Sequence, residues 1–455
     1  NLSFTGQKIK NNLKKKIFIK TFGCQMNEYD SNRILDITKE IQYEPTIDKT
    51  NADCYIINTC HIREKATEKV FHDIGRIKKS YRNKKKPIVI ITGCVAQAEG
   101  DLILQKEKYV DAVVGPQSYQ TINKIIEKVE NKKKRSEETN FDVIDKFDKL
   151  KLIKNSNSKV SSFLTIQEGC DKFCKFCVVP YTRGAEFSRS FKEILQEANQ
   201  LVANGSREIT LLGQNVNAYR DKNRRLSDIL YSLEEIKELK RIRYTTSHPK
   251  DMTKDLIQAH KDCKKLMPLL HLPIQSGSDK ILQSMNRKHT AKEYLEIINK
   301  LKKNNDDLEF TSDFIISYPG ESENDFINTC DLMKKVKFIN SYSFIYSPRP
   351  GTPASELKII NSDISLKRLK IFQRIAERIK IDYKKKLLNN TVKVLFENKV
   401  KNESDKYFGR DKHQNPVIVQ SNQDLLGKEK NVIIKKISMH TIYGEVVNHD
   451  KNLAA

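Results

Sequence analysis

The first hundred residues repeat one arrangement of apolar and polar positions three times. The stretches "KKIFIKTFGC", "ADCYIINTC" and "KPIVIITGC" each lead from a β-rich apolar run to a cysteine, and a segment with helical spacing follows each cysteine. Nearly continuous apolar strands that alternate with helices are typical of a parallel sheet covered on both faces. We therefore predict an N-terminal parallel-sheet α/β domain over residues 1–130.

The periodicity is lost after this region. Residues 131–160, which include "KKKRSEETNFDVIDKFDKLKLIKNSNSK", are rich in charge and short of periodic apolar faces, so they are predicted to form a charged linker. Residues 161–385 return to the α/β pattern, with six apolar runs that alternate with helical segments. Six such units indicate a curved parallel sheet, either a partial (β/α)6 barrel or an open sheet.

The last part of the chain changes pattern again. Residues 386–450 contain short alternating runs such as "TVKVLFEN" and "PVIVQS", separated by Gly, Asn and Asp. This pattern predicts a small antiparallel β-barrel, a type that often binds oligonucleotides. The α/β chain is thus expected to end in an all-β domain.

Cysteines supply the first candidate chemistry. Cys24, Cys60 and Cys94 each follow one of the three N-terminal strands, and the carboxyl ends of parallel strands share one edge of a sheet. We expect these thiols to converge on a shared metal site, although cysteine is also a common core residue. Three other cysteines lie within apolar or helical patterns and are predicted to be buried core residues: Cys54, Cys263 and Cys330.

A second group of cysteines lies in the loop after the first barrel strand, "EGCDKFCKFCVVPYTRG". Cys170, Cys174 and Cys177 provide three thiols, whereas a zinc site or a four-iron cluster normally has four ligands. A zinc ribbon would need a second Cys or His pair within about 20 residues, and the sequence has none there. One coordination position is therefore left without a protein ligand.

Composition and charge narrow the functional classes. The odd count of nine cysteines and the lack of a secretory segment make a disulfide framework improbable, which favours a cytoplasmic protein with reduced thiols. No apolar stretch approaches the length of about 18 residues that a membrane span needs. The net charge of +25 favours a polyanionic partner, although a Lys-, Asn- and Ile-rich composition also arises from an AT-rich genome.

The cysteine loop resembles that of the radical S-adenosylmethionine enzymes, which have Cys-x3-Cys-x2-Cys after the first strand of a barrel. Almost the whole chain resembles the MiaB-type tRNA methylthiotransferases, through "TFGCQMNEYDS", "INTCHIREKA", "GCVAQ", "LLGQNVNAY", "TSHPKDM", "HLPIQSGS" and "FIYSPRPGTPA". The C-terminal strands resemble the RNA-binding TRAM domain. The segment "FIISYPGES" departs from the family pattern, because it has Ile-Ser-Tyr where relatives usually have Val-Gly-Phe. The resemblance therefore does not predict the backbone conformation at Ser317.

The resemblance implies two 4Fe-4S clusters. One cluster would be held by Cys170, Cys174 and Cys177, and its open iron would bind S-adenosylmethionine. Reduction of S-adenosylmethionine by this cluster would give methionine and a 5′-deoxyadenosyl radical. An auxiliary cluster would deliver sulfur to carbon 2 of N6-isopentenyladenosine next to the anticodon of tRNA, and a second S-adenosylmethionine would supply the methyl group. Its ligands would be Cys24, Cys60 and Cys94.

Other candidate residues follow the barrel strands. Gln214, Ser247 and Gln275 come after the second, third and fourth strands and are candidates to hold S-adenosylmethionine, or else close turns and cap helices. His248 and His271 are expected to be packed strand-end residues rather than ligands. Candidates for contact with substrate or RNA phosphate follow the cysteine loop or the last strand: Arg183, Arg189, Tyr346 and Arg349.

Alternatives remain open at this point. Related methylthiotransferases act on threonylcarbamoyladenosine in tRNA or on a ribosomal protein, and they share the six cysteines. A two-cluster electron carrier would explain the irons, and an RNA-binding protein would explain the charge. The main interpretation also implies an electron donor such as a flavodoxin or a ferredoxin, no membrane partner and a monomer.

Overall fold

The computed structural model describes residues 14–60, 66–132, 135–140, 143–150, 154–156, 159–438 and 441–447. It contains two compact units, Asn1–Lys154 and Asn155–Ala455. Residues 61–65 of the motif "INTCHIREKA" and the last three residues of the predicted C-terminal domain lie outside the described part. Each unit is considered by itself.

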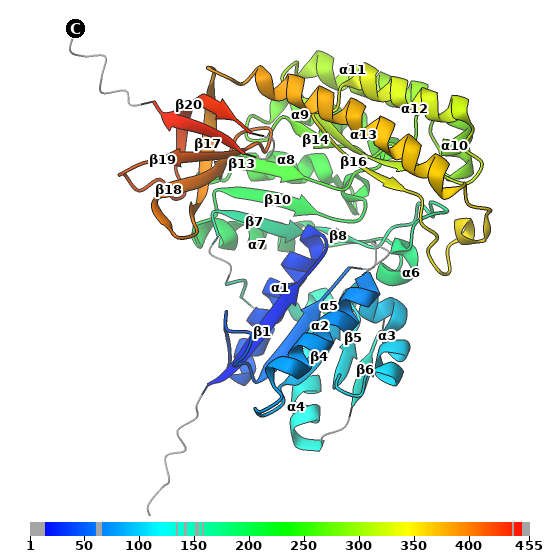
Figure 1. The fold of residues 1–455 in the computed structure, drawn as a ribbon. Helices are drawn as coiled ribbons and strands as arrows, with labels where there is room; N and C mark the ends of the chain where they lie inside the picture. The colour runs from blue at the N-terminus through cyan, green and yellow to red at the C-terminus, as the bar shows by residue number, and fades with distance from the viewer. Residues whose placement is uncertain are drawn as a thin grey trace, which may run out of the picture. The chain divides into compact units, whose positions relative to one another are not determined.

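The first unit is built on a six-stranded, wholly parallel sheet of order β2-β1-β3-β4-β5-β6 (Figure 1). All five residues of β3 are buried, which explains its uninterrupted apolar run. The strands are β1 (Lys15–Thr21), β2 (Tyr43–Pro45), β3 (Cys54–Asn58), β4 (Ile88–Thr92), β5 (Ala112–Val114) and β6 (Ser136–Glu138). The helices are α1 (Gln25–Thr38), α2 (Ala66–Ser80), α3 (Cys94–Lys106), α4 (Ile122–Lys132) and α5 (Val143–Leu150).

The predicted linker, residues 131–160, contains two regular elements, β6 and α5. Strand β6 pairs in parallel with β5, and α5 buries Phe147 and Leu150. The Lys146 ammonium is also buried and donates to the Pro116 carbonyl at 2.9 Å. The apolar positions of "VIDKFDKL" have helical spacing, which the many charges around them obscure. The division between the units falls at Lys154 and Asn155, within the predicted linker.

The second unit begins with the predicted six-stranded parallel arrangement. Two three-stranded sheets, β7-β10-β13 and β14-β15-β16, are joined by a parallel bridge between Ile242 and Leu266. The strands are β7 (Ser161–Thr165), β10 (Glu208–Leu212), β13 (Arg241–Tyr244), β14 (Leu269–His271), β15 (Glu309–Ile316) and β16 (Asn340–Ile345). The prediction of a partial (β/α)6 barrel is thus confirmed.

Helices follow the barrel strands and cover the outside of the sheet. They are α7 (Phe191–Ala203), α8 (Leu226–Glu234), α9 (Lys254–Asp262), α10 (Asp279–Ser284), α11 (Ala291–Asn304) and α12 (Glu323–Val336). Capping boxes fix two of their starts, through Thr290 with Glu293 and through Ser322 with Asp325. The long helix α13 (Ser362–Lys385) packs against α12 and β16 (Figure 1).

Helix α13 leads into a closed five-stranded barrel of order β17-β18-β19-β21-β20. Four of its pairings are antiparallel and β19–β21 is parallel. Its strands are β17 (Thr391–Val400), β18 (Glu403–Arg410), β19 (Pro416–Gln420), β20 (Glu429–Ile437) and β21 (Ile442–Val446). The small barrel predicted from the alternating pattern is therefore present.

The closed barrel packs on the central barrel. Arg241 and Arg243 lie at the beginning of β13, are buried, and donate to the carbonyls of Arg410 and Lys412 at 2.8 and 2.9 Å. This contact explains why residues 155–455 form one unit. Among the described helices, none combines the length and the apolar character that crossing a bilayer requires.

Candidate functional site

The three N-terminal cysteines follow three neighbouring strands. Strand β3 pairs with β1 on one side and with β4 on the other, and the register aligns the strand ends Thr21, Asn58 and Thr92. The loops that carry Cys24, Cys60 and Cys94 therefore leave the sheet at one edge and at one level. Cys60 and Cys94 are buried, whereas Cys24 is exposed.

Two glycines allow these loops to approach one another closely. Gly23 has φ +111°, and a Cβ added to it would lie 2.3 Å from the Cβ of Cys60. Gly93 has φ +91°, and a Cβ there would lie 2.4 Å from the Thr59 carbonyl oxygen. Both positions require glycine for conformation and for space. The "GC" pairs at residues 23–24 and 93–94 thus bring the cysteine loops into contact.

An amide network fixes the first of these loops. The Asn27 side chain donates to the Phe22 carbonyl at 2.8 Å, and Asn58 donates to the Asn27 carbonyl and to Ser31 at 2.9 Å. The Cys24 sulfur lies 3.8 Å from Oδ1 of Asn27. Residues of α1 and β3 therefore hold the Cys24 loop in place.

The second group of cysteines lies in a closed loop at the first barrel strand. Strands β8 (Gln167–Glu168) and β9 (Phe187–Ser188) pair across its base, and the short helix α6 (Val179–Arg183) lies within it. Gly169 has φ +74°, and a Cβ there would lie 1.9 Å from the Ala185 carbonyl oxygen. Only glycine fits this crossing.

Neighbouring loops anchor the cysteine loop to the barrel. Gln214 accepts a hydrogen bond from the Gly169 N–H at 2.7 Å. The buried side chain of Gln167 donates to the Gly169 carbonyl at 2.7 Å and accepts from the Asn215 N–H at 3.0 Å. The Lys175 N–H donates to the Met285 carbonyl at 3.0 Å. Gln214, predicted to contact a cosubstrate, is thus seen to position the cysteine loop.

The thiols of this loop suit a cluster. Burial raises the pKa of the Cys170 thiol to about 11 and that of Cys177 to about 12, so thiolates there need a bound cation. The Arg287 guanidinium donates to the Cys174 sulfur at 3.4 Å. Across the described residues, no three Cys, His, Asp or Glu side chains form the close group that ligates one metal ion. A cluster makes a different demand, because each thiolate binds its own iron.

Polar atoms without a hydrogen-bond partner among the described residues lie at the carboxyl ends of several barrel strands. The hydroxyls of Ser247, Ser317 and Tyr346 follow β13, β15 and β16, and all three are buried. Buried hydroxyls are normally hydrogen-bonded, so this end of the barrel has capacity for a polar ligand. Gln275, predicted to act with Ser247, is 9% exposed and follows β14.

Strained backbone is also concentrated at this end of the barrel. Non-glycine residues with positive φ include Phe173, Thr246, Gln275 and Ser317. Such conformations cost energy and cluster at functional sites. Ser317 has φ +58°, a conformation that glycine adopts without strain.

Histidines at the strand ends are packed residues, as expected. His248 accepts from the Lys250 N–H at 3.2 Å, and His271 contacts the Thr311 hydroxyl at 2.9 Å. Burial, together with the nearby Arg287 charge, holds the pKa of His248 far below its usual range. The same causes lower the pKa of His289, whose ring lies 5.7 Å from that of His248, to about 4.

The predicted substrate-binding residues differ in their placement. Arg183 is buried, with Nη1 3.4 Å from Glu168 Oε2. Arg189 is buried and donates to the Thr165 carbonyl at 2.6 Å and to Glu197 at 2.8 Å, which argues against contact with RNA. The buried ring of Tyr346 packs edge-on against Tyr318, so only its hydroxyl is in a position to meet a ligand.

Arg349 is half-buried in the loop after β16, and its carbonyl accepts hydrogen bonds from Thr352. Of the predicted core cysteines, Cys54, Cys263 and Cys330 are all buried, which confirms that prediction.

The structure adds site residues that the sequence pattern did not single out. One is Arg287, which contacts Cys174. The other is Glu186, which lies in the cysteine loop, where burial raises the pKa of its carboxyl to about 7. Its charged neighbours include Lys172 and Asp251, which form an ion pair at 2.8 Å. Arg287 is 113 residues from Cys174, so no local spacing in the sequence connects it with the cysteine loop.

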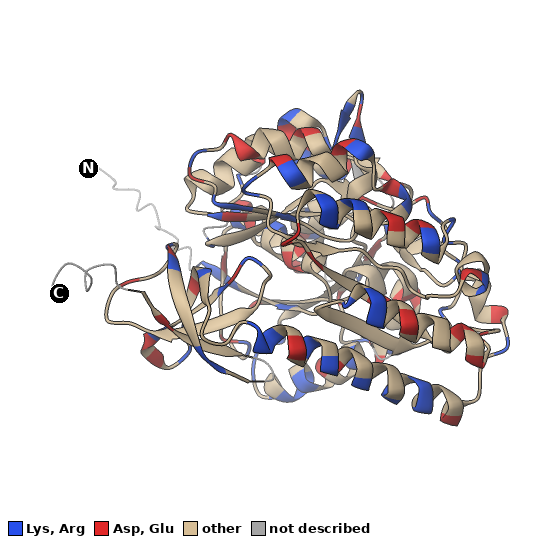
Figure 2. Ribbon diagram, turned by 90° about the horizontal axis from the view of Figure 1, so that it is seen from above, with Lys and Arg blue, Asp and Glu red and all other residues tan. Residues whose placement is uncertain are grey.

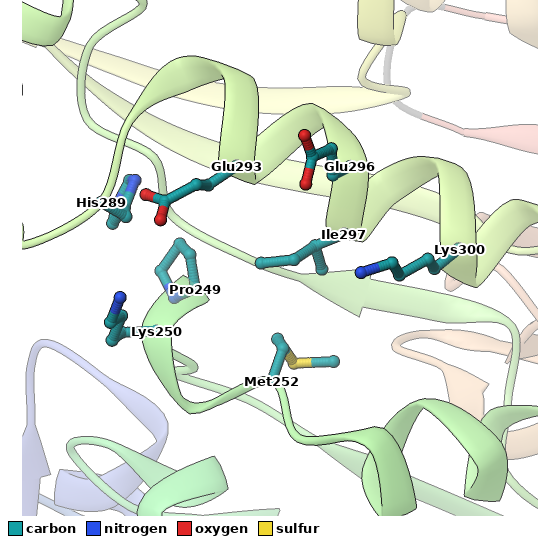
Figure 3. A pocket seen from close by; sticks show the side chains of 8 residues that line it. All are labelled: Pro249, Lys250, Met252, His289, Glu293, Glu296, Ile297 and Lys300. Atoms are coloured by element: carbon teal, nitrogen blue, oxygen red, sulfur yellow. The ribbon is translucent and has the colours of Figure 1, made fainter.

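A cleft of about 220 Å³ opens beside His289 (Figure 3). It lies between the segment after β13 and helix α11, and its walls carry both signs of charge. Pro249, Lys250 and Met252 face Glu293, Ile297 and Lys300 across it.

Two family models match the chain. The Uncharacterized protein family UPF0004 covers residues 16–115, and the Radical SAM superfamily covers residues 164–333. The chain is 56% identical over 445 residues to the tRNA-2-methylthio-N(6)-dimethylallyladenosine synthase of Pelagibacter ubique, spanning 97% of this chain and 100% of that protein. A protein of the same name from Rickettsia typhi is 47% identical, with 96% and 100% covered.

Among solved structures, the fold is similar to that of the radical S-adenosylmethionine methyltransferase TsrM from Kitasatospora setae, with cobalamin and a [4Fe-4S] cluster bound. The TM-score is 0.56 at 10% identity, and the match covers 75% of this chain and 77% of that chain. At this identity the likeness concerns the fold alone. The fold is therefore shared with a protein of very different sequence.

Proposed function

We propose that this chain, which belongs to the family of radical S-adenosylmethionine tRNA-2-methylthio-N(6)-dimethylallyladenosine synthases, methylthiolates carbon 2 of N6-isopentenyladenosine next to the anticodon of tRNA. The product would be 2-methylthio-N6-isopentenyladenosine. One observation carries the proposal. Six cysteines form two groups of three at the carboxyl ends of two parallel sheets, and each group would supply three of the four ligands of a 4Fe-4S cluster.

The side chains divide the work between two sites. Cys170, Cys174 and Cys177 would hold one cluster, and Cys24, Cys60 and Cys94 the other. The bound clusters supply reductive cleavage of S-adenosylmethionine and delivery of sulfur. Radical chemistry is needed because an aromatic C–H bond is too strong and too weakly acidic for side-chain bases.

Residues of the barrel would bind and orient S-adenosylmethionine. Gln214 holds Gly169 and so fixes the loop that carries the thiols. The Ser247 and Ser317 hydroxyls and the Gln275 amide lie at successive strand ends, where they can satisfy the polar groups of the cosubstrate. The Tyr346 hydroxyl and Arg349 would face the target nucleoside, and Arg183 would support the loop from within.

The charge of helix α13 supports tRNA binding. Lys and Arg recur along this helix (Figure 2), and the helix has eight of them against three Asp or Glu. Lys367, Lys370, Arg374, Arg378 and Lys385 are exposed, and spacings of three, four or seven residues place them on one face. No ion pair joins these five to another described residue. A stripe of unpaired cations fits a phosphate backbone.

We further propose a TRAM-like role for the closed barrel in RNA binding, a one-electron donor such as a flavodoxin or ferredoxin, and a cytoplasmic monomer. The donor is needed because reductive cleavage of the cosubstrate consumes an electron. The cytoplasmic location is proposed because the tRNA substrate is in the cytoplasm.

The test is anaerobic incubation of the reconstituted chain with S-adenosylmethionine, a reductant and isopentenylated tRNA, followed by mass spectrometry of the nucleosides. We expect 2-methylthio-N6-isopentenyladenosine. Modification of threonylcarbamoyladenosine instead would assign a different substrate. A chain that binds iron but releases no 5′-deoxyadenosine would favour an electron carrier. If the chain binds no iron and forms no product, RNA binding is the only function left.

A further inference from the structure

The Arg287 side chain is buried in the loop after α10 and reaches the cysteine loop. It is 5% exposed, and its Nη2 donates to the Pro273 carbonyl at 2.6 Å. Its Nη1 donates to the Cys174 sulfur at 3.4 Å, across 113 residues of sequence. The guanidinium is therefore fixed at both terminal nitrogens, with one of them directed at a thiol of the barrel group.

Within the described chain, Arg287 has no carboxylate partner. No ion pair among the described residues includes it, and its buried Nε has no hydrogen-bond partner among them. Of the nearby ring systems, His248 and His289 are bases that cannot neutralise a cation. A buried arginine without a counter-charge is costly, because removing a charge from water without a partner is strongly unfavourable.

The negative charge that would balance Arg287 is therefore expected on the thiolates of the cysteine loop, where Arg287 contacts the Cys174 sulfur. Three thiolates give a cluster a net negative charge, and reduction by one electron increases that charge. A fixed cation at hydrogen-bond distance from one ligand sulfur stabilises the reduced form more than the oxidised form, and hydrogen bonds to cluster sulfurs are known to set reduction potentials.

We propose that Arg287 is the electrostatic counter-charge of the cluster held by Cys170, Cys174 and Cys177, and that it makes this cluster easier to reduce. Arg287 is a positioning residue that acts through the Cys174 sulfur. The inference rests on the proposed function only in assigning that cluster to these thiols.

The test is a redox titration of the full-length reconstituted chain, followed by electron paramagnetic resonance. The signal that S-adenosylmethionine perturbs identifies the barrel cluster. For Arg287→Met we expect the one-electron reduction equilibrium to fall at least about tenfold, a 59 mV shift to lower potential. Arg287→Lys keeps the charge but loses the planar fork, so its shift should be smaller. The control Lys288→Gln removes an exposed charge from the next residue and should cause no shift.

A second measurement has its main readout in the wild-type chain. In the wild-type chain grown with guanidino-15N arginine, hyperfine spectroscopy of the reduced barrel cluster should detect a 15N coupling that Arg287→Lys abolishes. An Arg287→Met variant with four barrel irons and an unchanged potential would overturn the inference, as would the absence of 15N coupling in the wild-type chain. Either result would leave tRNA methylthiolation intact, whereas failure of the proposed function would appear as loss of product in the wild-type chain.

Discussion

The two cysteine groups are assembled in opposite ways. The barrel group comes from one loop, where Cys170, Cys174 and Cys177 lie within eight residues. The N-terminal group comes from three loops that follow three adjacent strands of a different sheet. A contiguous group is specified by local spacing, whereas a distributed group exists only when the sheet forms in the correct order.

This difference extends to how each site is supported. At the N-terminal group, the positive φ angles next to the cysteines belong to Gly23 and Gly93. At the barrel group, non-glycine residues such as Phe173 and Gln275 also adopt positive φ. The N-terminal site thus depends on loops that pack closely because they contain glycine. The barrel site depends on loops in which residues with side chains adopt strained backbone conformations, and neighbouring segments anchor these loops.

The largest expected effect separates the two groups by function. Replacing Cys170, Cys174 and Cys177 with alanine should abolish cleavage of S-adenosylmethionine to 5′-deoxyadenosine, because the barrel cluster is the site of cleavage. Iron should fall from about eight to about four per chain. Chromatography of the nucleoside products measures the first effect, and iron analysis the second.

The matched variant replaces Cys24, Cys60 and Cys94. It should also keep about four irons and should still cleave the cosubstrate, yet make no methylthio product. A folded variant of this kind that keeps its irons but fails to cleave would show that the two clusters are assigned the wrong way round.

The second prediction concerns the close approach of the distributed loops. Gly93→Ala should lower the free energy of unfolding by about 2–4 kcal/mol, because the added Cβ meets the Thr59 carbonyl and φ is +91°. Loss of iron from the N-terminal group should accompany the loss of stability. Thermal unfolding and iron content after reconstitution provide the measurements.

Gly75 provides the control for this change. It lies in α2 with no atom within 4 Å of an added Cβ, so Gly75→Ala should stabilise by about 1 kcal/mol. Equal destabilisation by the two substitutions would remove the argument that loop contact defines the N-terminal group.

The third prediction concerns RNA binding by the second unit. Changing Lys367, Arg374 and Arg378 to glutamine should weaken tRNA binding by about tenfold to a hundredfold and reduce the salt slope by about one per lost phosphate contact. Point substitutions are preferable to removing the closed barrel, because its loss would expose the buried Arg241 and Arg243. Filter binding across a range of salt concentrations measures both quantities.

An equal change of charge elsewhere is the control. Lys237, Lys254 and Lys261 are exposed on or near α8 and α9, and their replacement with glutamine should have a much smaller effect. If both triple variants weaken binding equally, net charge rather than the α13 stripe attracts the tRNA.

The smallest expected effect tests the strain at the barrel mouth. Ser317→Gly should raise the free energy of unfolding by about 0.5–1 kcal/mol, because relief at φ +58° exceeds the extra chain entropy of glycine. Ser343→Gly, in the interior of β16, should destabilise by a similar amount. A calorimetric loss of stability for Ser317→Gly would mean that its buried hydroxyl stabilises the fold.

Prediction from sequence was most successful where structure follows from local pattern. Apolar runs and turn residues were sufficient for both parallel sheets and for the closed barrel. They failed at β6 and α5, where short elements with many charges concealed a weak apolar periodicity. The sequence pattern also suggested Arg189 as a substrate-binding residue, although Arg189 is buried in the fold and donates to Glu197.

The sequence by itself determined the two sets of thiols and their positions after strands, because spacing along the chain and strand periodicity are local properties. Only the tertiary structure decided that Arg287 meets Cys174, that Gln214 holds Gly169, and that the closed barrel caps Arg241. These contacts join residues far apart in the chain. Their partners are chosen by the packing of whole elements, which no local pattern encodes.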